Sequence, residues 1–97
     1  RNPTHFAVAV KYDEYKNNAP VILAKGADNM AMRIVKIAEE NKITMVENKP
    51  LARGLYDSVE VGREIPPEFY SAVAEVLSFV YRLHGKLPGG GQNKNYY

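Results

Sequence analysis

Four residues near the start of the chain, Asn2-Pro3-Thr4-His5, are of types that could break a peptide bond. Proline has no backbone N–H, so the nitrogen of Pro3 cannot attack the Asn2 side chain to form the usual succinimide. What remains is attack by the Asn2 side-chain nitrogen on its own main-chain carbonyl, which expels the Pro3 nitrogen and cleaves the chain. An amide is a poor nucleophile, so this reaction needs strain, orientation and a donor for the developing oxyanion.

The same four residues also suit an inert turn. The His5 imidazole could move a proton near neutral pH, and the Thr4 hydroxyl could bond to local backbone. Asn followed by Pro is a common β-turn pairing, because Asn bonds to nearby backbone and Pro presets φ. From the motif alone, both a self-cleaving site at Asn2, Pro3, Thr4 and His5 and a simple turn stay open.

Composition argues against several other kinds of site. The chain has 97 residues, 45% of them hydrophobic and 25% charged, which indicates one small domain with enough apolar material for a core. Its net charge of +2 comes from basic and acidic residues scattered along the chain, so no nucleic-acid partner is expected. Cysteine is absent, and the sequence has no metal-ligand spacing, triad pattern or phosphate loop. We therefore expect neither a metal nor another cofactor.

Strand patterns occur at 6–12, 21–25 and 43–47. The first alternates larger apolar residues with small or polar ones, and Gly26 should end the second. Three strands would make a thin sheet, so we expect a fourth strand upstream of Asn2 to complete it. The prediction is an α/β fold with a small mixed β-sheet, three of its strands in this chain, packed with about three helices.

The helices are predicted from apolar residues spaced three and four apart. Asp28 should cap a helix that ends near Asn41, with an apolar stripe toward the sheet that contains Met30, Ile34, Ile37 and Ala38. Asn48 should cap a short helix over 50–59. A long C-terminal helix within 65–83 should carry one apolar face that contains Phe69, Val73, Val76, Val80 and Leu83.

The remaining segments bear on domain organisation and location. Residues 1–83 should form one domain, and 84–97 should be a mobile tail because they are rich in Gly, Pro and Asn and lack apolar periodicity. The most apolar stretch, 69–83, is shorter than the roughly 20 residues of a membrane-spanning helix and contains two charged residues. No signal-peptide pattern is seen, and cytosolic exposure is the expectation. The start at Arg1 suggests a piece of a longer protein.

Five further segments follow the Asn-Pro-Thr-His motif in a fixed order: AVAVKYD, APVILAKGAD, IAEEN, PLARGLY and IPPEFYSAVAEVL. From Asn2 to about Leu83, this ordered set closely resembles the cytoplasmic domain of the type III export switch proteins, the FlhB/YscU family. The segments AKGAD and VEVGREIPPEFYSAVAEVL look like the flagellar branch more than the virulence-injectisome branch.

The resemblance implies a membrane protein whose transmembrane part precedes this chain, with a cytosolic domain at the cytoplasmic face of the bacterial inner membrane. It implies self-cleavage, with Asn2 as the cyclising residue, Pro3 as the new N-terminus, and Thr4 and His5 as the supporting pair. The halves would stay associated while the domain helps change export from rod and hook proteins to filament proteins. The implied partners are its own N-terminal fragment, other export-apparatus membrane proteins, export substrates and the hook-length control protein.

We expect a switch rather than a turnover enzyme, since cleavage consumes its own bond. Exposed apolar residues should bind export substrates, and the candidates are Ala19, Pro20, Ala74 and Leu77. Leu77 could instead fill the core. Two alternatives stay open: a non-cleaving α/β adaptor that binds peptides or export substrates along a sheet edge, and a virulence-type secretion homologue. A small-molecule enzyme would need an assembled acid, base and nucleophile, which the sequence lacks.

Overall fold

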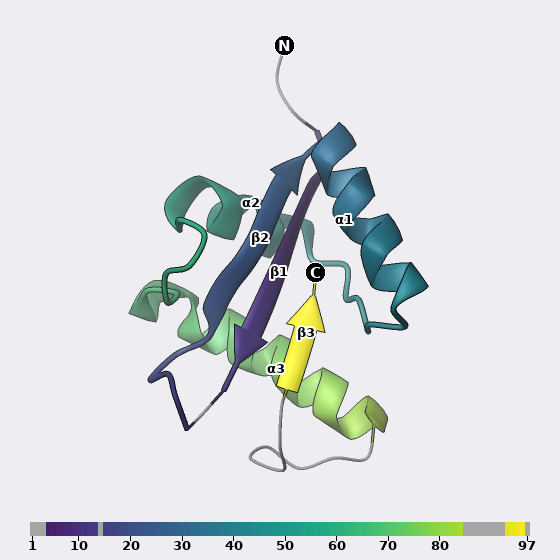
Figure 1. Ribbon diagram of the computed structural model, residues 1–97. Helices are drawn as coiled ribbons and strands as arrows, with labels where there is room; N and C mark the ends of the chain where they lie inside the picture. Colours follow the sequence, from purple (N-terminus) through teal and green to yellow (C-terminus); the bar gives the residue numbers. More distant parts are fainter. Residues whose placement is uncertain (1–3, 14, 85–92, 97) are drawn as a thin grey trace.

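The structure of the protein, a computed structural model, describes residues 4–13, 15–84 and 93–96 (Figure 1). In chain order the elements are β1 (Phe6–Tyr12), β2 (Val21–Ala27), α1 (Asn29–Glu40), α2 (Lys49–Ser58), the 3-10 helix η1 (Pro67–Phe69), α3 (Tyr70–His84) and β3 (Asn93–Tyr96). The expected α/β class, with three α-helices of which the last is the longest, is confirmed. Within the described ranges, no helix has the length and apolar character that a membrane crossing requires.

β1 is the central strand of a three-stranded sheet with the order β2-β1-β3 (Figure 1). It pairs antiparallel with β2, with Phe6 opposite Ala27, and a bulge interrupts the register after Ala9. β3 pairs antiparallel with the later part of β1, from Ala9 to Tyr12. The described pairings are thus antiparallel where a mixed sheet was expected, and the third described strand is β3 instead of the predicted strand at 43–47.

The segment 43–47 forms no strand between α1 and α2, so that prediction is wrong for the described structure. Its apolar residues fit a strand, and Met45 forms a single β-bridge, but the residues on either side of Met45 do not continue the pairing, so no strand forms. The expected tail at 84–97 lies mostly outside the described residues. Of its described part, His84 ends α3 and Asn93–Tyr96 forms β3, which was not predicted.

The main core lies between one face of the sheet and helices α2 and α3. Six large side chains are fully buried there: Val8, Val10, Ile22, Leu55, Ile65 and Val73. On α3, the predicted apolar face is confirmed for Val73, Val76 and Val80. Leu83 is exposed, contrary to prediction, because it lies in the last turn, beyond the last buried residue of the helix, Tyr81.

Helix α1 packs against the other face of the sheet through small residues. Ala7 and Ala9 on β1 are buried but do not belong to the main core, as expected when alternate residues of a strand face opposite sides. The buried residues of α1 are Ala31 and Ala38. The predicted stripe is therefore right for Ala38 and wrong for Met30 and Ile37, which are 51% and 54% exposed. Small residues let α1 approach the sheet closely, and this rotates its larger apolar residues outward.

Helix α2 is capped at its start by the residue that precedes it and is bound at its C-terminal end by a side chain of β2. Its predicted start is confirmed: the Asn48 side chain accepts a hydrogen bond from the backbone N–H of Leu51, 3.2 Å away. At its C-terminal end, the Lys25 ammonium donates to the carbonyl oxygens of Tyr56 and Val59, both at 2.9 Å. Lys25 is on β2, so these bonds attach α2 to the sheet.

Candidate functional site

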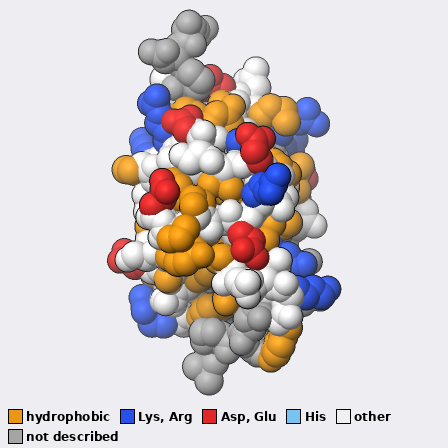
Figure 2. Space-filling model, turned by 90° about the vertical axis from the view of Figure 1, so that its left-hand side faces the viewer, with side chains coloured by type: hydrophobic (Ala, Val, Ile, Leu, Met, Phe, Trp, Pro, Cys, Tyr) orange, Lys and Arg blue, Asp and Glu red, His pale blue; other side chains and the backbone are white. Residues whose placement is uncertain are grey.

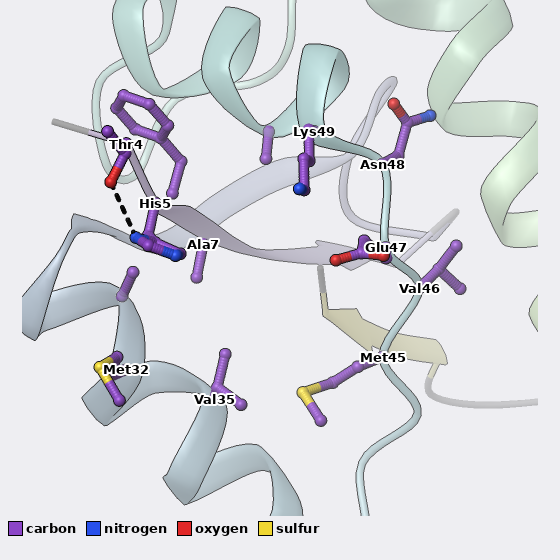
Figure 3. Close-up of a pocket in the computed structure, with 13 residues that line it drawn as sticks. Thr4, His5, Ala7, Met32, Val35, Met45, Val46, Glu47, Asn48 and Lys49 are labelled. Carbon is purple, nitrogen blue, oxygen red and sulfur yellow. Dashed lines mark hydrogen bonds between the residues drawn. The ribbon is translucent and has the colours of Figure 1, made fainter.

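The predicted cleavage motif is described from its third residue onward. Asn2 and Pro3 lie outside the described residues, while Thr4 and His5 are exposed and directly precede β1. The Thr4 hydroxyl and the His5 Nδ1 atom are 3.0 Å apart, within hydrogen-bond distance (Figure 3). The two residues that follow the Asn-Pro bond are therefore in contact with each other and open to solvent at the start of the central strand.

Asp28 holds both of these residues by their backbone. Its Oδ1 atom accepts hydrogen bonds from the N–H groups of Thr4 and His5, each at 3.2 Å. Its own N–H donates to the His5 carbonyl oxygen at 2.8 Å, and Oδ1 lies 3.8 Å from His5 Nδ1. Asp28 is the N-cap residue of α1, as predicted, but its side chain forms no cap hydrogen bond, and the carboxylate binds the motif instead.

Sheet register brings Asp28 to the motif. Phe6 and Ala27 are paired residues at adjoining ends of β1 and β2, so the residues just outside them, His5 and Asp28, also meet. Asp28 has a φ of 50°, a conformation that non-glycine residues rarely adopt. Sequence reasoning identified Asp28 as a helix start, but its contact with Thr4 depends on strand register, which the sequence left unspecified.

Gly26 allows this junction to be compact. It lies inside β2, although the sequence predicted that it would end the strand. A Cβ atom at this position would lie 2.7 Å from the Met30 Cβ and 2.9 Å from the Met30 carbonyl carbon. Contacts that short do not occur between a real Cβ atom and its neighbours, so only glycine lets the first turn of α1 lie this close to β2. This turn directly follows Asp28.

Aromatic and cationic side chains hold the first residue of β1 from the side of α2. The rings of Phe6 and Tyr56 are 5.0 Å apart between centroids, in a tilted arrangement. The Arg53 guanidinium lies 5.5 Å from the centre of the Phe6 ring, and the Lys25 ammonium lies 5.2 Å from the centre of the Tyr56 ring. The start of β1 is thus anchored to α2 by Phe6 and to the β2–α1 junction through Asp28.

A pocket of about 410 Å³ opens beside the motif. Its lining comes from the start of β1, from α1, from residues 45–49 and from the beginning of α2. Figure 3 shows Val35 of α1 and Met45 of the connecting segment on opposite sides of this space, with His5 toward one end. The lining is mostly apolar, which suits a hydrophobic chain segment more than a polar reaction.

The four residues predicted to bind export substrates do not form one exposed surface. Ala19 and Leu77 are 2% and 6% exposed and belong to the main core, so their predicted role in an exposed patch is wrong. Pro20 is half-buried, and Ala74 is exposed on α3. Figure 2 shows apolar side chains near the middle of one face, bordered by acidic and basic ones. Among residues 4–13, 15–84 and 93–96, no three His, Asp or Glu side chains are grouped to hold a metal ion.

Comparisons with known proteins identify the family of this chain. Residues 1–80 match the family described as the FlhB HrpN YscU SpaS family, so the chain belongs to that family. It is 54% identical over 86 residues to the flagellar biosynthetic protein FlhB of Bacillus subtilis (strain 168), covering 89% of this chain and 24% of that protein. It is 50% identical over 91 residues to FlhB of Escherichia coli (strain K12), covering 94% and 24%. The chain thus spans about a quarter of these relatives.

Solved structures of similar proteins have the same fold. The cytoplasmic domain of FlhB from Shewanella putrefaciens matches with a TM-score of 0.80 and 42% identity, over 82% of this chain and 62% of that one. The PscU C-terminal domain matches with a TM-score of 0.77 and 36% identity, over 80% of this chain and 99% of that one. The chain therefore corresponds to the cytoplasmic, C-terminal part of such proteins.

Proposed function

We propose that this chain is the cytoplasmic part of a flagellar type III export protein that cleaves itself between Asn2 and Pro3 and thereby helps switch export from rod and hook proteins to filament proteins. In the cell it lies at the cytoplasmic face of the inner membrane, attached through an upstream membrane region. Support comes from membership of the FlhB family and from the placement of Thr4 and His5.

The proposed reaction consumes one peptide bond and needs no water or cofactor. The Asn2 side-chain nitrogen forms a bond to the Asn2 main-chain carbonyl carbon, and the bond from that carbon to the Pro3 nitrogen breaks. One proton of the side-chain amide ends on the Pro3 nitrogen, and His5 is placed nearby in the sequence to carry it. The products are an N-terminal fragment that ends in a cyclic imide and a C-terminal fragment that begins at Pro3. The protein acts once and is not a turnover enzyme.

The observation that carries this proposal is the hold on Thr4 and His5. Cyclisation requires the amide nitrogen and the carbonyl carbon to be kept near each other, since orientation replaces the missing nucleophilic strength. Backbone bonds from Asp28 and ring contacts to Phe6 fix the chain directly after the Asn-Pro bond.

The upstream part of the protein is proposed to bind as a strand and to remain bound after cleavage. Among the described strands, β3 pairs with β1 only from Ala9 to Tyr12, so the edge of β1 nearest the motif faces the pocket. A strand that returns from an Asn2-Pro3 turn would enter this space and would pair along 43–47, where Met45 forms a single bridge. A strand longer than a few residues would have to replace β3. This would explain why 43–47 has a strand pattern without forming a strand here.

The remaining partners are proposed from family membership alone: other membrane proteins of the export apparatus, the hook-length control protein and export substrates. Of the residues first considered for substrate binding, Pro20 and Ala74 keep accessible surface. The alternative is a non-cleaving adaptor that binds peptides along the same strand edge, in either a flagellar or a virulence-type apparatus.

Mass spectrometry of the full-length protein tests the proposal. We expect two fragments that meet between Asn2 and Pro3, with masses that add up to that of the intact chain before the imide takes up water. Asn2→Ala should stay intact, and the matched control Asn17→Ala should cleave like the parent. In a motile host, Asn2→Ala should export hook protein and reduce filament protein. An intact parent chain after long incubation would favour the adaptor.

A further inference from the structure

We propose that Asp28 is a positioning residue for the cleavage between Asn2 and Pro3. This inference rests on the proposed function and assigns a role in it to a residue outside the Asn-Pro-Thr-His motif. Asp28 is 24 residues from Thr4 in sequence, and its carboxylate binds the two backbone N–H groups that follow Pro3.

Three hydrogen bonds join Asp28 to the motif. One carboxylate oxygen accepts from two successive N–H groups, those of Thr4 and His5, and the Asp28 N–H returns a bond to the His5 carbonyl at 2.8 Å. These three bonds join the same two segments. Asp28 occupies the position before α1 where an Asp normally caps the helix, yet it forms no side-chain cap bond.

The backbone at Asp28 is also held in a conformation that costs energy. Its φ of 50° and ψ of −110° lie outside the regions that a residue with a side chain prefers. Such conformations persist when surrounding structure imposes them, and they concentrate at functional sites. A helix start could be built without this cost, so the conformation is explained by what the carboxylate binds.

The covalent geometry of Pro3 links the position of the Thr4 nitrogen to that of the Pro3 nitrogen, which is the leaving atom of the proposed cleavage. Between the Thr4 nitrogen and the Pro3 nitrogen, the peptide bond is planar and the Pro3 ring fixes φ. Only the ψ rotation of Pro3 remains free between these two atoms. Because Asp28 fixes the Thr4 N–H, the Pro3 nitrogen can move relative to it only by the ψ rotation of Pro3. This restriction favours the orientation in which the Asn2 side-chain nitrogen attacks the Asn2 carbonyl carbon.

An acceptor oxygen, more than a negative charge, is what this role requires. Asparagine at position 28 keeps a side-chain oxygen at the same distance from the backbone, and it tolerates a positive φ. Glycine removes the acceptor and tolerates the same φ without strain. The pair Asp28→Asn and Asp28→Gly therefore separates the hydrogen bonds from the charge and from backbone strain.

The test measures the rate at which newly made full-length protein in membranes splits into two fragments. Asp28→Gly should slow cleavage by about tenfold or more, and Asp28→Asn should stay within about threefold of the parent. The control Glu40→Gln, which alters an exposed carboxylate at the end of α1, should leave the rate unchanged. Equal rates for Asp28→Gly and the parent would overturn the inference, and so would an Asp28→Asn variant as slow as Asp28→Gly.

A second measurement does not depend on the folding of any Asp28 variant. In full-length Asn2→Ala, which keeps Asp28, the amide hydrogens of Thr4 and His5 should exchange slowly although both residues are exposed. Rapid exchange at both amides would overturn the inference. If the parent protein does not cleave at all, the proposed function fails and this inference fails with it. If the parent cleaves and Asn2→Ala does not, only the Asp28 variants and the amide exchange decide the inference.

Discussion

Replacing Lys25 by methionine should destabilise the domain strongly, although Lys25 is only half-buried. Methionine keeps the unbranched apolar stem of lysine and removes the ammonium, so packing along the stem is retained. What is lost are two hydrogen bonds of 2.9 Å to the Tyr56 and Val59 carbonyl oxygens, and the contact between the ammonium and the Tyr56 ring. Both oxygens are at the C-terminal end of α2, where helix carbonyls lack partners within the helix.

The expected loss follows from the number and type of these contacts. A hydrogen bond from a charged donor contributes about 1.5–3 kcal/mol, and a cation at a helix C-terminus adds about 0.3–1 kcal/mol. Because the site is half-buried, water can partly replace the ammonium. The loss of the two hydrogen bonds will therefore lower the free energy of unfolding by less than their full sum. We expect Lys25→Met to lower the free energy of unfolding by about 2–4 kcal/mol.

Urea unfolding followed by circular dichroism measures this loss. With a typical denaturant slope for a small domain, the urea midpoint should fall by about 1–2 M. The matched control is Lys36→Met on α1, an exposed lysine, which should change stability by less than about 0.5 kcal/mol. If Lys25→Met and Lys36→Met have the same small effect, the bonds from Lys25 to α2 do not stabilise the domain and the reasoning is wrong.

Three further changes test other parts of the structure. Gly26→Ala should cost about 1–3 kcal/mol in urea unfolding, since the new Cβ clashes with the backbone at Met30, and it should also slow cleavage. Asn48→Ala should cost about 1 kcal/mol by the same assay through loss of the α2 cap, and Asn48→Asp should not. If His5 moves the proton, His5→Gln should slow cleavage by about a hundredfold, and a parent-like rate in His5→Gln would exclude His5 from proton transfer.

Local sequence signals predicted the elements whose stability is local. The alternation at Phe6–Tyr12, the Asn48 cap and the spacing of Val73, Val76 and Val80 each fix an element by its own residues, and all three are confirmed. The predictions that are wrong concern features set by packing between elements, such as the orientation of a helix on the sheet. The outward turn of Met30 follows from the close approach of α1 to the sheet, which small residues on both elements permit.

The position of the candidate site along the chain could be predicted from the sequence, but the contacts between its residues could not. Proline closes the usual succinimide route and so makes Asn2-Pro3-Thr4-His5 a candidate cleavage site, but from these residues alone a simple turn stayed open, and the family resemblance is what favoured cleavage. The part played by Asp28 depends on the register of β1 and β2, and the sequence contains no signal that pairs Phe6 with Ala27. The strand predicted at 43–47 shows the reverse case, in which the local pattern is present but the pairing does not extend beyond one bridge at Met45.

The short stretch from Lys25 to Asp28 contacts α2, α1 and the start of β1, each through a different residue. Lys25 binds α2, Gly26 admits the first turn of α1, and Asp28 binds Thr4 and His5. Substitutions within these four residues should therefore affect the stability of the domain and the rate of cleavage independently. Lys25→Met should unfold more easily while its folded molecules cleave at nearly the parent rate, because the Asp28 bonds and the contact between the Phe6 and Tyr56 rings remain. Asp28→Gly should cleave slowly even when fully folded, because the bonds that it removes are exposed and position the motif. A parallel loss of both properties in both variants would mean that the motif senses only the overall stability of the domain.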